Sequence, residues 1–252
     1  IIGTPDLEDL DPFLMLDEFG SDEPSHYAGG FPDHPHRGFE TMTYMLAGRM
    51  RHFDNKGNSG LLTPGSVQWM TAGRGLIHSE MPEQEDGLLW GFQLWINLPA
   101  RDKMMAPRYQ DIAPENIAEA SCGAASRARV IAGSAFGVTG PVTGIVTDPL
   151  YVDLHLAADD SVSLAAGRGK TAFIYPYAGD IVIAGKRVAR GQLAVLGDGD
   201  LVAVATSAEG PAKAILVAAH PIREPVAKYG PFVMTTPQEI RQAIEDYRRG
   251  LF

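Results

Sequence analysis

The sequence predicts an all-β fold with a short C-terminal helix. Its 28 glycines and 18 prolines separate short runs that are rich in Val, Ile, Thr, Tyr and Trp, and such runs are typical of β-strands. The runs are short and evenly spaced, which favours a sandwich or a barrel. A weak resemblance between the two halves of the chain indicates that one β module is duplicated.

The strand-like runs of the first half are followed by a looser stretch. They cover residues 41–53, 61–62, 67–71, 76–81 and 88–98. From residue 99 to about residue 140 the pattern loosens, with Pro107, Pro114 and a run of small residues. This stretch is the predicted connection between two domains, because few strand signals cross it.

The second half repeats features of the first. Its strand-like runs cover residues 150–156, 171–177, 180–183, 192–196, 201–205 and 212–218. Residues 44–48 match 175–179, and residues 64–67 match 190–193, so a strand and a turn follow in the same order in each half. The repeat predicts that the two halves share one strand arrangement.

A helix is predicted near the end of the sequence. Thr236-Pro-Gln-Glu239 has the spacing of a capping box, with proline at the first helical position. Four apolar residues then recur at i, i+3, i+4 and i+7, namely Ile240, Ala243, Ile244 and Tyr247. The helix ends the second of two predicted domains, which cover residues 1–130 and 131–252.

Charge and cysteine content exclude several classes of protein. The 252 residues include 21 Lys and Arg against 31 Asp and Glu, a formal net charge of -10, so direct binding of nucleic acid is not expected. The single cysteine, Cys122, excludes an intrachain disulfide and favours a reducing compartment. No run is long enough to span a bilayer. We expect a soluble cytoplasmic protein, or a nuclear one in a eukaryote, although a chain that begins at Ile1 leaves room for a lost leader.

Two short segments carry residues that bind metals. His34 and His36 are two positions apart, as are His78 and Glu80, and residues at i and i+2 of a strand share one face. If the two strands adjoin, three imidazoles and one carboxylate surround a cation at about 2.0–2.2 Å, a set suited to iron, manganese, cobalt, nickel, copper or zinc. Glu40 lies an even number of positions after His34 and His36, so on a continuous strand it would point to the same face. It is therefore a second candidate carboxylate.

A purely structural interpretation competes with the metal site. A lone His-x-His in a proline-rich segment is more often an exposed turn, but the second pair favours the metal. His26 and His52 are predicted at the surface, because His26 lies in a polar loop and His52 follows two arginines near a hairpin tip. The repeat aligns the four candidate ligands with residues that lack ligand chemistry, namely Ala165, Gly167, Val204 and Thr206. We therefore predict one metal per chain, in the N-terminal domain.

Two long motifs contain the candidate ligands. They are Gly29-Gly-Phe-Pro-Asp-His-Pro-His-Arg-Gly-Phe-Glu-Thr-Met-Thr-Tyr44 and Gln68-Trp-Met-Thr-Ala-Gly-Arg-Gly-Leu-Ile-His-Ser-Glu-Met-Pro82. These motifs closely resemble the pirin family of the cupin superfamily, and the resemblance covers nearly the whole chain. It implies a bicupin, two tandem cupin (jelly-roll) barrels with a metal in the first. The implied ligands are His34, His36, His78 and Glu80.

The resemblance also leaves a role for Glu40. In many other cupins the carboxylate ligand follows the His-x-His pair, which places it here at Glu40. Glu40 is therefore an alternative ligand or a partner that supports a ligand.

The resemblance implies a dioxygenase as the first function. Pirin-like proteins are associated with quercetin 2,3-dioxygenase (flavonol 2,4-dioxygenase) activity, which opens the central ring of quercetin with O2 and releases carbon monoxide. The implied cofactor is one divalent transition metal, and Fe(II) is the first choice. Such a metal binds the flavonol hydroxyl and lowers its pKa. Glu80 and Glu40 are the candidate acceptors of the hydroxyl proton. Four residues are candidates to line an apolar pocket for a flat substrate, namely Phe31, Met45, Trp69 and Met70.

The alternative function is an iron-dependent, redox-sensing regulator. Such a protein binds a partner, for example a transcription factor or a metabolic enzyme, and changes its surface with the oxidation state of iron. The acidic charge and a second barrel without ligands suit a protein partner. We rank the enzyme first, because chemistry requires the complete ligand set. The predicted partners are therefore a flavonol-like substrate and O2, with a protein partner under the alternative and neither nucleic acid nor membrane.

Overall fold

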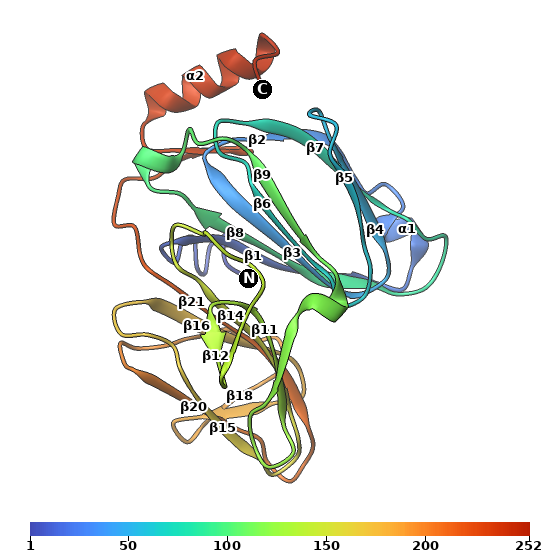
Figure 1. The fold of residues 1–252 in the computed structure, drawn as a ribbon, viewed down its shortest axis with the longest axis vertical. Helices are drawn as coiled ribbons and strands as arrows, with labels where there is room; N and C mark the ends of the chain where they lie inside the picture. The colour runs from blue at the N-terminus through green and yellow to red at the C-terminus, as the bar shows by residue number, and fades with distance from the viewer. The chain divides into compact units, whose positions relative to one another are not determined.

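The computed structural model describes residues 1–252, which form two compact units (Figure 1). Unit 1 contains residues 1–114 and 222–252, and unit 2 contains residues 115–221. Each unit is built mainly from two antiparallel β-sheets. None of the helices has both the length and the apolar character that crossing a bilayer requires.

Unit 1 is formed mostly by the first nine strands. They are β1 (Phe13–Ser21), β2 (Phe31–His36), β3 (Phe39–Ala47), β4 (Met50–Asp54), β5 (Ser59–Leu62), β6 (Val67–Thr71), β7 (Leu76–Pro82), β8 (Leu89–Asn97) and β9 (Arg108–Ile112). A short helix, α1 (Pro24–Tyr27), separates β1 from β2. The predicted run 41–53 is two strands, because Gly48 adopts a positive φ of 80° and turns the chain between β3 and β4.

The nine strands form two sheets with side chains between them. The larger sheet has the order β1-β8-β3-β6-β9, and the smaller has the order β2-β7-β4-β5. Because side chains alternate along a strand, every second residue points into the space between the sheets. Thr43 of β3 and Glu80 of β7, for example, are hydrogen-bonded across that space. This interior holds the candidate site.

Residues 222–252 return to unit 1 and hold the junction of β2 and β3. They form β22 (Ala227–Tyr229), β23 (Phe232–Met234) and α2 (Pro237–Arg248). Val233 N donates to Arg37 O at 3.0 Å, and a Cβ on Gly38 would lie 2.0 Å from Val233 O. Gly38, with a φ of 90°, is therefore the residue that the close approach requires.

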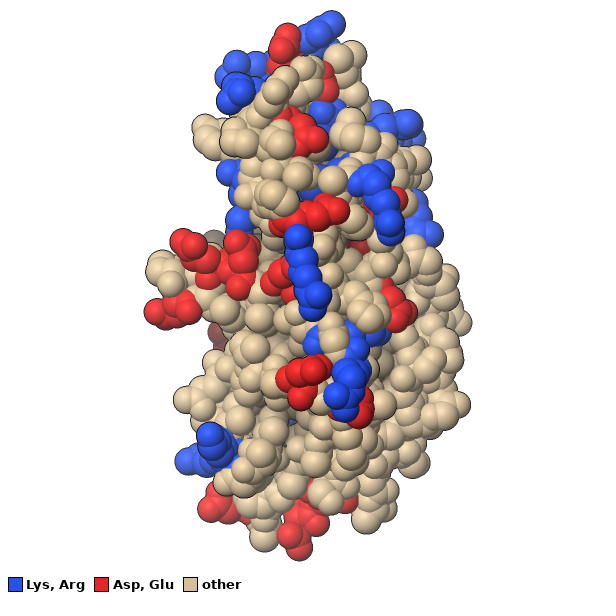
Figure 2. All heavy atoms as spheres, turned by 90° about the vertical axis from the view of Figure 1, so that its left-hand side faces the viewer, with Lys and Arg blue, Asp and Glu red and all other residues tan.

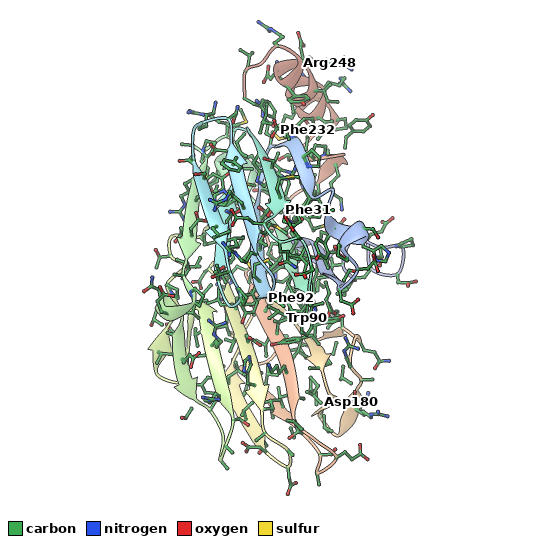
Figure 3. The ribbon with its side chains drawn as sticks, turned by 90° about the vertical axis from the view of Figure 1, so that its right-hand side faces the viewer. Phe31, Trp90, Phe92, Asp180, Phe232 and Arg248 are labelled. Carbon is green, nitrogen blue, oxygen red and sulfur yellow. The ribbon has the colours of Figure 1, made fainter.

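Helix α2 forms as its sequence predicts. Thr236 and Glu239 make the reciprocal bonds of a capping box. The apolar stripe of the helix packs on Phe232, which lies beneath it in Figure 3. The cluster consists of Phe232, Met234, Ile240, Ala243 and Phe252, with Ile244 and others at its edge. The helix thereby completes unit 1 on the side of β2.

Unit 2 repeats the strand arrangement of unit 1. Its strands are β10 (Ala118–Ser121), β11 (Arg127–Ala132), β12 (Ser134–Ala135), β13 (Val138–Thr139), β14 (Leu150–Leu156), β15 (Ser161–Ala165), β16 (Thr171–Ala178), β17 (Ile181–Ile183), β18 (Lys186–Val188), β19 (Ala194–Val195), β20 (Leu201–Ala205) and β21 (Ala212–Ala219). The order β15-β20-β17-β18 corresponds to β2-β7-β4-β5, and β14-β21-β16-β19 corresponds to β1-β8-β3-β6. The duplicated module is confirmed.

The stretch between the two repeats differs from the prediction. Instead of a loose connection, residues 99–140 contain the 3-10 helices η1 (Ala100–Asp102) and η2 (Pro114–Asn116) and five strands, β9 to β13. Strand β9 pairs with β6, whereas β11 pairs with β14. The compact units therefore differ from the predicted domains 1–130 and 131–252. Residues from 115 onward belong to unit 2 because β10 pairs with β11 and β11 with β14. Residues 222–252 belong to unit 1 because they pack against Arg37.

Charged side chains of both signs are interspersed over the face shown in Figure 2. Several ion pairs of the molecule are exposed, such as Arg49 with Glu83 and Arg168 with Asp200. Exposed pairs of this kind contribute about 0–1 kcal/mol each. The fold therefore depends on the interiors of the two units rather than on these surface pairs.

Candidate metal centre and its pocket

Strands β2 and β7 bring three histidines together, as predicted. The two strands pair in antiparallel fashion, and His34 lies directly opposite His78. His36 lies on the same face of β2, and its ring centroid is 5.0 Å from that of His78 and 4.7 Å from that of His34. One ring nitrogen of each histidine lies within 4.8 Å of the others. This is the only such group of three potential ligands in the molecule.

Each histidine of this cluster has a ring nitrogen that can bind a cation. Nδ1 of His34 donates to Pro32 O at 2.8 Å, which leaves Nε2 as the lone-pair nitrogen. Nδ1 of His36 and both nitrogens of His78 are buried without a hydrogen-bond partner. An orphaned buried polar group costs about 1–3 kcal/mol. A metal ion would take one nitrogen from each ring, so the three residues fit a metal ion.

The electrostatics of the cluster favour neutral imidazoles. Burial, together with the neighbouring His78 and His34, holds the pKa of His36 well below its usual range. Burial and the neighbouring His34 lower the pKa of His78 to about 3. Because a metal binds the deprotonated ring, both histidines are ready to act as ligands at neutral pH.

Glu80 lies beside the histidines but outside their tight group. It follows His78 by two residues on the inner face of β7, and it is buried. Thr43 donates to its Oε1 at 3.1 Å and Gln93 donates to its Oε2 at 3.0 Å. Burial raises the pKa of Glu80, and these two hydrogen bonds oppose the rise. A carboxylate has about four lone-pair sites, so two donors leave capacity for a cation.

The prediction for Glu40 needs correction, since its side chain points away from the site. Phe39, whose ring contacts His36, lies on the inner face of β3 as Thr43 does, so Glu40 lies on the outer face. There Thr71 Oγ1 donates to its Oε1 at 2.6 Å. The parity argument fails because the chain turns at Arg37-Gly38, between β2 and β3.

The prediction for His52 is also wrong, since the residue is buried rather than at the surface. Its side chain is 1% exposed, and it lies on the inner face of β4 directly opposite Glu80. A signal was present in the sequence, because Met50, His52 and Asp54 alternate with Arg51 and Phe53 as inward and outward residues do. The partner of His52, Asp111, is distant in sequence and could not be inferred.

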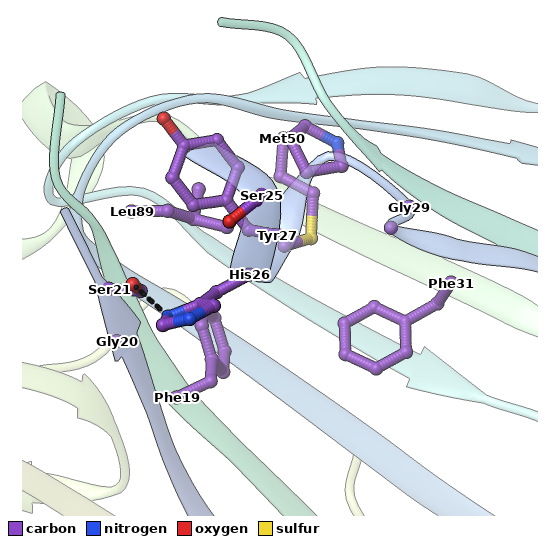
Figure 4. Close-up of a pocket in the computed structure, with 12 residues that line it drawn as sticks. Phe19, Gly20, Ser21, Ser25, His26, Tyr27, Gly29, Phe31, Met50 and Leu89 are labelled. Carbon is purple, nitrogen blue, oxygen red and sulfur yellow. Dashed lines mark hydrogen bonds between the residues drawn. The ribbon is translucent and has the colours of Figure 1, made fainter. Parts of the chain in front are cut away.

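A pocket of about 380 Å³ opens on the inner side of unit 1 (Figure 4). Its lining is mainly apolar and includes Phe19, Tyr27, Phe31, Met50, Pro82 and Leu89. At its edge, Ser21 Oγ and His26 Nδ1 lie 3.0 Å apart. Along β4 and β7 the opposed inward pairs are Asp54 with His78, His52 with Glu80, and Met50 with Pro82. The pocket therefore begins one inward position beyond Glu80.

The four residues predicted to line a pocket have different positions. Phe31 is 45% exposed and lines the pocket, as the sequence suggests. Met45 does not line the pocket but packs in a cluster with three residues that do, namely Tyr27, Met50 and Leu89. Met70 packs instead with Ala72 and Leu76. Trp69 shares the outer face with Glu40, because it lies two residues from Thr71 on β6.

Comparison with known proteins identifies the family. Residues 1–96 match the family model Pirin, and residues 151–252 match the model described as the Pirin C-terminal cupin domain. A pirin-like protein of Caulobacter vibrioides is 47% identical over 253 residues, which cover 100% of this chain and 91% of that protein. A Pseudomonas aeruginosa protein with a provisional quercetin 2,3-dioxygenase name is 46% identical over 259 residues, 100% of this chain and 90% of its own.

A solved structure agrees with this assignment. The crystal structure of a quercetin 2,3-dioxygenase from Acinetobacter baumannii superposes with a TM-score of 0.90 at 34% identity, and the match covers 96% of this chain and 86% of that one. The all-β architecture of two tandem cupin barrels with a short C-terminal helix is thereby confirmed. The chain belongs to the pirin family.

Proposed function

We propose that this protein is a metal-dependent dioxygenase that cleaves the central ring of a flavonol such as quercetin with O2. The observation that carries the proposal is the order of groups along the inner face of unit 1. Three free imidazoles come first, the carboxylate of Glu80 is next to them, and an apolar pocket follows. The similarity to proteins named as quercetin 2,3-dioxygenases supports this substrate class.

The proposed site binds one divalent transition metal, with Fe(II) as the expected native ion. His34, His36 and His78 supply three nitrogens, and Glu80 supplies an oxygen from the neighbouring inward position. Such a set leaves coordination positions open for a further ligand. When bound, the metal supplies Lewis-acid activation of the substrate hydroxyl.

The residues around the metal have separate tasks in the proposal. Phe19, Tyr27 and Phe31 provide aromatic surfaces for a flat substrate and exclude water from it. Glu80 is the carboxylate that faces the site, so we assign it the acceptance of the hydroxyl proton. Glu40 has no such role, because it points to the outer face of β3. We expect this enzyme in the cytoplasm, with the flavonol and O2 as its reactants.

Anaerobic reconstitution tests the proposal. The protein is loaded with each divalent metal in turn and then given quercetin and O2, and carbon monoxide is measured. We expect turnover that requires O2 and that disappears in His36→Ala and His78→Ala. Flavones that lack the 3-hydroxyl should react poorly, because they lose the group that anchors them to the metal.

One outcome would replace the enzyme by the regulator. If the metal-loaded protein consumes no flavonol above the rate of free metal, the dioxygenase proposal fails. If it then captures a specific protein partner only when iron is oxidised, the redox-sensing function takes its place. Flavonol turnover together with partner capture only when iron is oxidised would assign both activities to the same centre.

A further inference from the structure

A ring of polar side chains lies inside unit 1 at the level of Glu80. On the larger sheet, neighbouring strands place four residues in one row, namely Gln93, Thr43, Gln68 and Asp111. On the smaller sheet, Glu80 and His52 lie opposite each other in the facing row. Hydrogen bonds join the two rows, from Thr43 and Gln93 to Glu80 and between His52 and Asp111. We call these six residues the polar belt.

His52 is the least explained member of the polar belt. Its Nε2 lies 3.0 Å from Asp111 Oδ2, and Gln68 Nε2 donates to Asp111 Oδ1 at 3.1 Å. Its ring stacks on Tyr109 with a centroid distance of 5.2 Å. Because the carboxylate accepts from Nε2–H, the orientation of the ring is fixed. Asp111 is 39% exposed, so the anchor of this buried ring reaches solvent.

The neighbouring strand leaves room for this arrangement at Gly60. Gly60 lies opposite His52 on β5. A Cβ at Gly60 would lie 2.3 Å from His52 Nε2 and 2.6 Å from Asp111 Oδ2. Any side chain there would push the ring or the carboxylate out of place. The position of His52 therefore depends on three separate strands, β4, β5 and β9.

His52 in turn borders Glu80. Opposed residues of an antiparallel pair have Cβ atoms about 4.5–5.5 Å apart, and both side chains are almost fully buried. Without the imidazole, the space beside the carboxylate would be empty, and the side chain of Glu80 would gain rotamers that the packed interior now excludes.

We propose that His52, anchored by Asp111, is a positioning residue that keeps the carboxylate of Glu80 beside the three histidines. This proposal rests on the metal site of the proposed function. It assigns to the polar belt a task that the fold alone does not require, namely to set the coordination geometry of the metal. His52 itself binds neither the metal nor the substrate.

Cobalt(II) binding tests the proposal without any enzymatic assay. Apoprotein is titrated with Co(II), and both the affinity and the visible spectrum, which reports coordination geometry, are recorded. We expect His52→Ala to weaken Co(II) binding by about 10–100-fold, as changes in supporting residues do, and to alter the spectrum. His52→Gln keeps an N–H donor for Asp111 and should restore much of both.

A second variant disturbs His52 without altering it. Gly60→Ala should displace the ring and change the Co(II) spectrum in the same direction as His52→Ala. Gly210→Ala is the matched control, because a Cβ there meets nothing within 4 Å. Thermal unfolding of each variant shows whether metal loss merely follows loss of fold.

The outcomes separate the two proposals. If the wild-type protein binds no Co(II), the metal site itself is rejected. If the wild type binds Co(II) but His52→Ala and Gly60→Ala leave affinity and spectrum unchanged, the positioning role is rejected. A loss of affinity that parallels the loss of thermal stability, with no spectral change and no rescue by His52→Gln, also rejects it.

Discussion

Two buried glutamates of unit 1 show how much depends on the face of a strand. Glu80 points inward and accepts from Thr43 and Gln93, whereas Glu40 points outward and accepts from Thr71. Both are almost inaccessible to solvent, and both have a pKa that burial raises. Only the first can contribute to a metal centre between the sheets.

This difference predicts unequal effects of the same substitution. Glu80→Gln removes a negative oxygen beside the three histidines and should release most of the metal. Glu40→Gln should leave the metal content unchanged, because the outer face of β3 has no access to the site. Elemental analysis of both reconstituted variants is the measurement. An empty site in Glu40→Gln and a full one in Glu80→Gln would overturn the assignment.

Glu40 should instead affect stability as a function of pH. Its pKa rises from 4.5 to about 7, with burial as the largest cause. Between these values the folded chain holds a proton that the unfolded chain has lost, so stability falls as pH rises through this window. The effect is on the order of 3 kcal/mol. Urea unfolding on either side of the window should show a flatter pH dependence for Glu40→Gln, and an unchanged slope would contradict this cause.

Strand alternation accounts for what the sequence predicts well and what it does not. His34 could be placed with His36, and His78 with Glu80, because each pair lies within one strand; the pairing of β2 with β7 then brings the three histidines together. Glu40 could not, because its relation to His36 crosses the turn at Arg37-Gly38, where parity is lost. The burial of His52 depends on Asp111, which joins the sheet only through the long-range pairing of β9 with β6. Local patterns thus predict residues within elements, and contacts between elements decide the rest.

Helix α2 is joined to the C-terminal end of β2 through Arg37, the residue next to His36. The guanidinium donates to Asp246 Oδ2 at 2.7 Å and to Arg74 O at 2.6 Å, and it lies 4.2 Å from the ring centroid of Phe252. The side chain of Arg37 is 4% exposed and that of Asp246 is 17% exposed. The buried positive charge of Arg37 is therefore stabilised by the carboxylate of Asp246.

Asp246→Asn should therefore destabilise the protein by roughly 3 kcal/mol, since removal of one partner of a buried pair leaves an uncompensated charge. The control is Glu245→Gln on the same helix, whose partner Arg249 is exposed and 4.0 Å away, and which should change stability by less than about 0.5 kcal/mol. Chemical denaturation of both variants is the measurement. Equal losses of unfolding free energy in the two variants would show that the buried Arg37–Asp246 pair contributes no more than an exposed pair.

The molecule as a whole contains one strand arrangement twice, but only one copy has the cluster of candidate metal ligands. In unit 2 the inward residues of β15 and β20 are all apolar, namely Val162, Leu164, Val202 and Val204. They occupy the core where β2 and β7 of unit 1 present histidines and Glu80. The two units therefore share one strand arrangement but differ in their interiors, which are apolar at these positions in unit 2.

We accordingly expect one equivalent of metal per chain after reconstitution. Elemental analysis of the full chain should give close to one, and His78→Ala should reduce it toward zero while the apolar core of unit 2 stays intact. Two tightly bound equivalents would show that unit 2 holds a site of its own.

The return of residues 222–252 to unit 1 has a consequence for biosynthesis. A ribosome makes β2, with His34 and His36, early, but it makes Val233 and Asp246, the residues that secure Arg37, only after all of unit 2. The nascent first barrel must wait, with the strand of its ligands incompletely anchored, while the second barrel is translated and able to fold. The contacts that complete the packing of β2 are thus among the last that translation permits.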